Sequence, residues 1–235
     1  MYDTVEETMK ILVTGGKGKI GREVCVHLDR KGHEVSVFDK LLDEDYDIRD
    51  TITLERFFAE HTPETVVHLA AWPCPMDYPI RSYVANNVIG TLNVAEASLE
   101  SGIKRLIFTS STAYYGYESS LGLPPHIPDE QAMSLVDWLR ADDGYQLSEL
   151  RYGISKVCAE SLLAYYGLSQ QFEVVILRFA PVPRHLKLGL TMEKAVEAIR
   201  LAIEYPDPLW YEVFNIGTEP GLGVEKARKI LGFNA

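Results

Sequence analysis

TGGKGKIG, at residues 14–21, joins the apolar run KILVT (10–14) to REVCVHL (22–28), in which apolar residues recur at helical spacing. We expect a buried strand that passes directly into a helix, with three evenly spaced glycines at the turn: Gly15, Gly18 and Gly21. The missing side chains let the backbone approach a pyrophosphate, and the N–H groups at the start of the helix can hold the anion. The stretch therefore predicts the phosphate-binding turn of a dinucleotide site.

Short apolar or β-branched runs alternate with amphipathic stretches along the rest of the chain. They predict strands at 10–14, 34–38, 65–69, 104–109, 173–178 and 213–216, and helices near 19–31, 51–61, 82–101, 152–170, 191–204 and 223–231. Parallel strands need long crossover connections, which place helices on both faces of a sheet. The pattern therefore predicts an α/β fold with a doubly wound parallel sheet.

Three regions follow from this pattern. Residues 1–8 are polar and aperiodic and are expected to form a loose tail, residues 9–178 the dinucleotide-binding domain, and residues 179–235 a small, reduced C-terminal substrate region that includes the strand near 213–216. The long irregular stretch 112–151 is typical of a lid or binding loop, with a short helix possible in SLVDWLRA (134–141).

Composition narrows the class of protein. With 235 residues, 46% hydrophobic and 24% charged, the chain is expected to form one main domain, and its apolar stretches are too short to span a bilayer. A formal net charge of -11 argues against a nucleic-acid partner. The three cysteines lack metal-ligand spacing and no signal segment opens the chain, so we expect no metal site and a cytoplasmic location.

Asp39 ends the second expected strand, about 20 residues after the glycine turn, where a carboxylate can accept a hydrogen bond from the ribose 2′-hydroxyl of NAD. The same carboxylate would repel the 2′-phosphate of NADP, so NAD is the expected cofactor. Lys17, Lys19 and Lys40 could instead pair with that phosphate, which leaves NADP as the alternative.

A second group of residues indicates proton transfer. In YGISK (152–156), Tyr152 and Lys156 stand four residues apart and share a helix face, so the ammonium can lower the pKa of the phenol toward that of a useful base. FTSSTAYYG (108–116) places hydroxyls just past the fourth strand, at the sheet edge where such folds bind ligands: Ser110, Ser111 and Thr112. Together they could hold a substrate hydroxyl or carbonyl beside the base.

With these motifs the chain resembles an extended short-chain dehydrogenase/reductase of the NAD-dependent epimerase/dehydratase family, over nearly all of residues 9–232. YDIRD (46–50), HLAAW (68–72), NNVIGTLNV (86–94) and FNIGT (214–218) also match the family pattern in order. The resemblance implies an NAD(P)-binding Rossmann fold and a cofactor site formed by these residues: Gly15, Gly18, Lys19, Ile20, Gly21, Asp39, Asp47, Ile48, Leu69, Ala70, Ala71, Asn87, Tyr152 and Lys156. His68 is expected to line the same cleft.

The resemblance also implies catalytic roles. Tyr152 would act as the acid/base, Lys156 would hold the nicotinamide ribose and tune Tyr152, and Ser111, five residues before Gly116, would orient the reacting oxygen. The helices near 82–101 and 152–170 would pair into a homodimer interface, for which Val157, Leu162, Leu163 and Tyr166 are the expected apolar residues.

Departures from the family pattern bear on the substrate. Thr112 and Ala113 follow Ser111 where dehydratases carry Asp-Glu, which argues against dehydration. The stretch LRFAPVPR (177–184) lacks the asparagine that helps nucleotide-sugar enzymes hold a diphosphate, which weakens that interpretation. We expect Ser111, Thr112 and Arg178 to contact substrate, with Arg184, His185 and Lys187 as further candidates for binding a carboxylate.

Three functions remain open from the sequence. The first is an NAD-dependent dehydrogenase that oxidises a secondary or anomeric hydroxyl of a sugar or sugar acid, as in uronate-dehydrogenase-like relatives. The second is a nucleotide-sugar epimerase with transient hydride transfer. The third is a non-catalytic NAD(P)-binding sensor or scaffold, against which the presence of Ser111, Tyr152 and Lys156 argues.

Overall fold

The computed structural model describes residues 8–74, 76–115, 147–182, 189–218 and 222–234. The expected tail at 1–8 (apart from its last residue), the SLVDWLRA segment and the candidate residues Arg184, His185 and Lys187 lie outside these ranges.

A six-stranded parallel sheet forms the centre of the molecule, in the order β2-β1-β3-β4-β5-β6. The strands are β1 Lys10–Thr14, β2 Glu34–Phe38, β3 Thr65–His68, β4 Arg105–Ser111, β5 Glu173–Phe179 and β6 Tyr211–Ile216. After β1 the chain crosses to β2 on one side and then returns to β3 on the other. The carboxyl ends of β1 and β3 therefore form the switch point at which open α/β sheets bind ligands.

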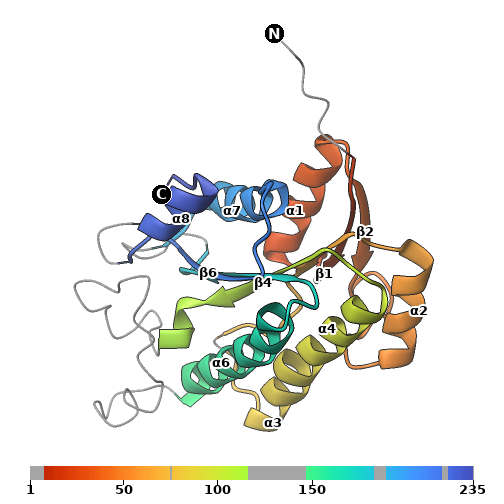
Figure 1. Cartoon of the computed structure of the whole chain (residues 1–235). Coiled ribbons are helices and arrows are strands. Elements are labelled where there is room, and N and C mark those ends of the chain that lie inside the picture. Colours follow the sequence, from red (N-terminus) through yellow and green to blue (C-terminus); the bar gives the residue numbers. More distant parts are fainter. Residues whose placement is uncertain (1–7, 75, 116–146, 183–188, 219–221, 235) are drawn as a thin grey trace.

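Helices cover both faces of this sheet (Figure 1). One face carries α1 Lys19–Arg30, α7 Met192–Glu204 and α8 Glu225–Leu231. The other carries α2 Thr51–His61, α4 Gly90–Glu100 and α6 Leu147–Leu168, with α4 and α6 side by side. The predicted doubly wound α/β fold is confirmed.

Alternate residues of the strands form two separate cores. On β1, Val13 packs toward α1 and α7, whereas Leu12 packs toward α2 and α4. The first core also contains apolar residues of α7, β6 and α8. Residues after 179 therefore share a core with the dinucleotide-binding part, and β6, expected near 213–216, is a neighbour of β5.

Two segments differ from the sequence expectation. The single helix expected at 82–101 is α3 Ile80–Tyr83, a π-helical segment η1 Val84–Ile89, and then α4. Residues 39–50, between β2 and α2, form successive turns, and β2 is an edge strand. No helix among the residues described combines the length and apolar character needed to cross a bilayer.

Candidate active site

The glycine turn between β1 and α1 leaves no room for a side chain at Gly15 or Gly21. Gly15 has a φ of +72°, and a Cβ there would lie 2.6 Å from the backbone nitrogen of Ala70. A Cβ on Gly21 would overlap the carbonyl oxygen of Gly15. Gly18 is the N-cap of α1 and provides no side-chain cap, so N–H groups of the first turn can bind an anion. These features fit a pyrophosphate at the switch point.

The end of β3 lies against this turn. Leu69 donates its N–H to the Thr14 carbonyl at 3.0 Å, which holds Leu69 and Ala70 beside Gly15. Leu69, Ala70 and Ala71 are all half-buried, as residues that line a cleft would be. Ile20 is likewise half-buried and packs on the core from the first turn of α1.

Asp39 lies beside the same turn, just after β2. Its carboxylate accepts N–H bonds from Lys17 and Leu41, both at 2.8 Å. These bonds fix the carboxylate next to the glycine turn. Lys19, by contrast, is exposed and donates its ammonium to the Val182 carbonyl at 3.3 Å.

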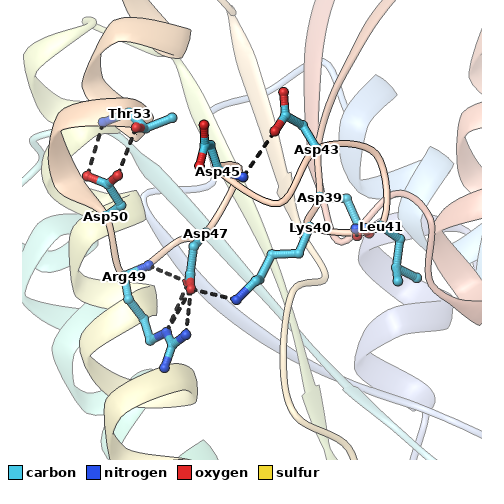
Figure 2. A network of polar contacts seen from close by, with 9 residues as sticks. All are labelled: Asp39, Lys40, Leu41, Asp43, Asp45, Asp47, Arg49, Asp50 and Thr53. Atoms are coloured by element: carbon cyan, nitrogen blue, oxygen red, sulfur yellow. Dashed lines mark hydrogen bonds and ion pairs between the residues drawn. The ribbon is translucent and has the colours of Figure 1, made fainter.

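Asp47 lies on the turns that follow (Figure 2), and Ile48 is the next residue along the chain. The Asp47 carboxylate accepts bonds from the Lys40 ammonium at 2.9 Å and from the side chain and N–H of Arg49. These bonds, with that to Arg49 foremost, hold the pKa of Asp47 well below its usual range. Ile48 is buried against Gly90 at the start of α4, so its side chain belongs to the core.

Helix α6 packs directly on the end of β4. A Cβ on Gly153 would lie 2.6 Å from the carbonyl oxygen of Ala113, in the 3-10 turn η2 Thr112–Tyr115 that follows β4. Only glycine allows this approach, which brings the helical turn with Tyr152 against the segment that contains Ser111 and Thr112. Ser111 is 8% exposed, and its Oγ accepts the Ala113 N–H at 3.1 Å.

Lys156 is buried beneath Tyr152. Its ammonium donates to the Thr109 carbonyl at 2.9 Å and lies 4.7 Å from the ring centroid of Phe108 and 5.6 Å from that of Tyr152. Burial lowers the pKa of Lys156 to about 8, while Glu160 opposes the shift. The pair therefore combines a half-buried phenol with a desolvated cation, which can stabilise a phenolate.

Asn87 connects three elements. Its Oδ1 accepts the Trp72 N–H at 2.8 Å, and its Nδ2 donates to the Trp72 carbonyl at 3.1 Å and to Ser155 Oγ at 3.0 Å. Ser155 donates in turn to the Tyr152 carbonyl at 2.7 Å. In this arrangement Asn87 fixes the loop after β3 against α6, the helix that contains Tyr152. The sequence analysis did not identify Ser155, although its place beside Lys156 was a signal.

His68 does not line the cleft, and that expectation is wrong. The imidazole is 1% exposed, between Thr14 Oγ1 at 2.6 Å and Thr91 Oγ1 at 2.9 Å. Because Thr91 donates its proton to the Asn87 carbonyl, it must accept from Nε2–H, and Nδ1 accepts from Thr14. Burial lowers the pKa of His68 to about 3, so it stays neutral.

Arg178 is engaged within the protein. Its guanidinium pairs with the buried Glu160 carboxylate at 2.7 Å, donates to the Tyr115 hydroxyl at 2.8 Å and stacks 3.4 Å from the ring centroid of Tyr114. Tyr115 donates onward to Asn215 at 2.8 Å. This network joins β5, α6 and β6, and it engages the Arg178 guanidinium, expected to contact substrate, with protein groups.

The model of the NAD dependent epimerase/dehydratase family matches residues 11–182. The chain is 32% identical over 212 residues to a UDP-glucose 4-epimerase of Rhizobium meliloti, covering 83% of this chain and 59% of that protein. It is 33% identical over 129 residues to a UDP-glucose 4-epimerase of Klebsiella pneumoniae, covering 46% of this chain and 93% of the relative. The chain thus spans 59% of the length of the first curated relatives it matches.

Solved structures share the fold. A Thermotoga maritima UDP-glucose 4-epimerase with UDP-glucose is 25% identical, with a TM-score of 0.69 over 97% of this chain and 84% of that one. The Bordetella bronchiseptica enzyme WbmG, in complex with NAD and UDP, has a TM-score of 0.74 at 23% identity, over 100% and 91% of the two chains. Since the family model extends from β1 to the residues just past β5, the chain belongs to the NAD-dependent epimerase/dehydratase family.

Proposed function

We propose that this chain is an NAD-dependent enzyme that moves a hydride at a hydroxyl-bearing carbon of a sugar. The observation that carries the proposal is the close packing of α6 on η2, which brings Tyr152 and a buried lysine to the carboxyl edge of the sheet. A sensor or scaffold would need the glycine turn but would not need a base at this edge.

The cofactor site fits NAD. The glycine turn and the start of α1 would hold the pyrophosphate, Asp39 the ribose diol, and the turn with Asp47 and Ile48 the adenine side. When bound, NAD supplies the hydride acceptor. NADP is the less favoured cofactor because its 2′-phosphate would meet the Asp39 carboxylate.

The chain's own residues accept and stabilise the proton that leaves the substrate hydroxyl. Tyr152 takes the proton of the substrate hydroxyl, Lys156 stabilises the phenolate through its charge, and Ser111 orients the reacting oxygen. Lys156 bonds the Thr109 carbonyl and needs only one of its three protons for this, so two remain for the nicotinamide ribose and for water.

For the substrate we favour a nucleotide sugar that is epimerised, because the related proteins are UDP-glucose 4-epimerases and solved neighbours hold UDP or UDP-glucose. The second candidate is net oxidation of a free sugar or sugar acid. The absence of an asparagine in the stretch after Arg178 favours it, since that stretch then offers no side-chain amide to a diphosphate.

The test is incubation of the chain and NAD with UDP-glucose, UDP-galactose and free sugar acids, followed by nicotinamide absorbance and by separation of the sugar products. An epimerase interconverts the UDP-sugars without accumulating NADH, whereas a dehydrogenase accumulates NADH with one sugar. Binding of NAD with no turnover of any sugar would favour the sensor instead.

We also propose a homodimer, in the cytoplasm, through the helical faces of η1 and α6. Leu163 and Tyr166, expected at such an interface, instead pack in the core. Apolar side chains that remain exposed are Val84, Ile89, Tyr165 and Leu168, at 37 to 70%. Light scattering at micromolar concentration tests this assembly, and a monomer would refute it.

A further inference from the structure

Residues 39–50 form an acidic segment beside the proposed adenosine end of the cofactor site. The segment carries six acidic and two basic residues, and the basic ones are Lys40 and Arg49. Lys40 directly follows Asp39, so its long side chain starts next to the carboxylate proposed for the ribose. In this position a free ammonium would attract a 2′-phosphate and would work against the selectivity that Asp39 provides.

Asp47 engages both of these cations. Figure 2 shows the Lys40 side chain extended from the end of β2 to the Asp47 carboxylate, with Arg49 reaching the same carboxylate from the other side. The Asp47 side chain is 16% exposed, whereas those of Lys40 and Arg49 are 52% and 42% exposed. One less solvated anion thus lies between two cations that would otherwise be available to an anionic ligand.

The Asp47 carboxylate has further support. Its Oδ1 accepts the Arg49 N–H at 3.0 Å. Ile48, between them, is buried, and its carbonyl accepts a hydrogen bond from the Asn93 side chain at 3.0 Å. Asp47 is therefore held through the backbone and beside the core, whereas Lys40 is its more exposed partner.

We infer that Asp47 is a specificity-determining residue that holds the Lys40 ammonium away from the 2′ position of the adenosine ribose and so strengthens the preference for NAD over NADP. This inference rests on the proposed cofactor site. In this site Asp39 repels the 2′-phosphate directly, while Asp47 engages Lys40, a cation that could compensate.

The test compares NADH and NADPH binding by nucleotide fluorescence in the full chain. Asp47→Asn keeps the shape and one acceptor but removes the charge that holds Lys40. Asp45→Asn is the matched control, because it removes one charge from an exposed side chain of the same segment, and Figure 2 shows no interaction between Asp45 and Lys40. Thermal melting of each variant shows whether it is folded.

In Asp47→Asn we expect the Kd ratio of NADPH to NADH to fall about tenfold, with a smaller effect at high salt. In Asp45→Asn we expect a change below about twofold. Adding Lys40→Met to Asp47→Asn should restore the wild-type ratio, whereas adding Arg49→Met should not.

Three results would overturn the inference: an equal change in both Kd values in Asp47→Asn, an equal ratio change in Asp45→Asn, or restoration by Arg49→Met rather than Lys40→Met. An equal weakening of both nucleotides would mean that Asp47 contacts only the part they share. A wild-type chain that binds neither nucleotide would instead refute the proposed cofactor site together with this inference.

Discussion

Gly153→Ala is expected to damage catalysis much more than folding. The added Cβ would lie 2.6 Å from the Ala113 carbonyl oxygen, whereas ordinary contact begins at 3.4 Å, so α6 and η2 must separate by up to 0.8 Å, the difference between the two distances. A misplacement of about 1 Å at reacting groups can cost roughly 100-fold in rate. We therefore expect kcat to fall between about 10- and 100-fold. Stability should change by less than about 2 kcal/mol, since overpacking is offset in part by the better helix propensity of alanine.

Gly167→Ala is the matched control for this variant. It lies in the same helix, and its Cβ would press into the Trp210 carbonyl oxygen, but it is 14 residues or about 21 Å further along. We expect it to lower the melting temperature while kcat stays near the wild-type value. Steady-state turnover with the substrate that the sugar incubations identify, together with thermal melting, tests this prediction. Unchanged kcat in a folded Gly153→Ala would refute the view that this contact positions the catalytic residues.

Three further perturbations test the proposed chemistry. Tyr152→Phe should reduce turnover by about 10²- to 10⁴-fold and leave NADH binding intact, as measured by kinetics and fluorescence titration; full turnover would remove Tyr152 from the mechanism. Asp39→Asn should weaken NADH binding and narrow the gap to NADPH, because the ribose and the Lys17 N–H lose a charged acceptor; an unchanged ratio of the two affinities would contradict this. Because burial lowers the pKa of Lys156 to about 8, NADH binding should weaken as the pH rises above 8. From that pH up to the ordinary lysine pKa, the free energy of unfolding should rise with pH, because the unfolded chain still binds a proton that folded Lys156 has lost. Lys156→Met should abolish both trends.

The fold was predictable because each strand is a short apolar run that is clearly separated from the next by an amphipathic stretch. All six strands are present near their expected positions. The largest differences are at the start of β6, Tyr211 rather than 213, and at the end of β4, which runs to Ser111 rather than 109. Ser110 and Ser111, expected just past the fourth strand, therefore lie within it. Hydrophobic periodicity could not separate π-helical from α-helical turns, which is why the helix expected at 82–101 is divided in the structure.

The candidate site was predictable where backbone geometry demands a residue type, as at Gly15 and Gly21. Polar residues were harder, because a side chain at the edge of a sheet can face either the cleft or the core. His68 faces the core between two threonines, and Arg178 is paired with Glu160. Glu160, four residues after Lys156, was a possible sign of that pairing, but helical spacing alone does not identify its partner.

The π-helical segment η1 has a consequence for how this chain can change. A π-helical turn corresponds to an α-helix that has gained one residue, and here it places Asn86 and Asn87 in the interior one after the other. Deleting a single residue within 84–89 would restore a regular helix and rotate one flank against the other by about 100°, the angle between successive α-helical residues. Asn87 would then lose either Trp72 or Ser155. A deletion here would therefore disturb the protein more than a substitution at one of the exposed positions, Val84 or Ile89, because it would separate the loop after β3 from the helix that contains Tyr152.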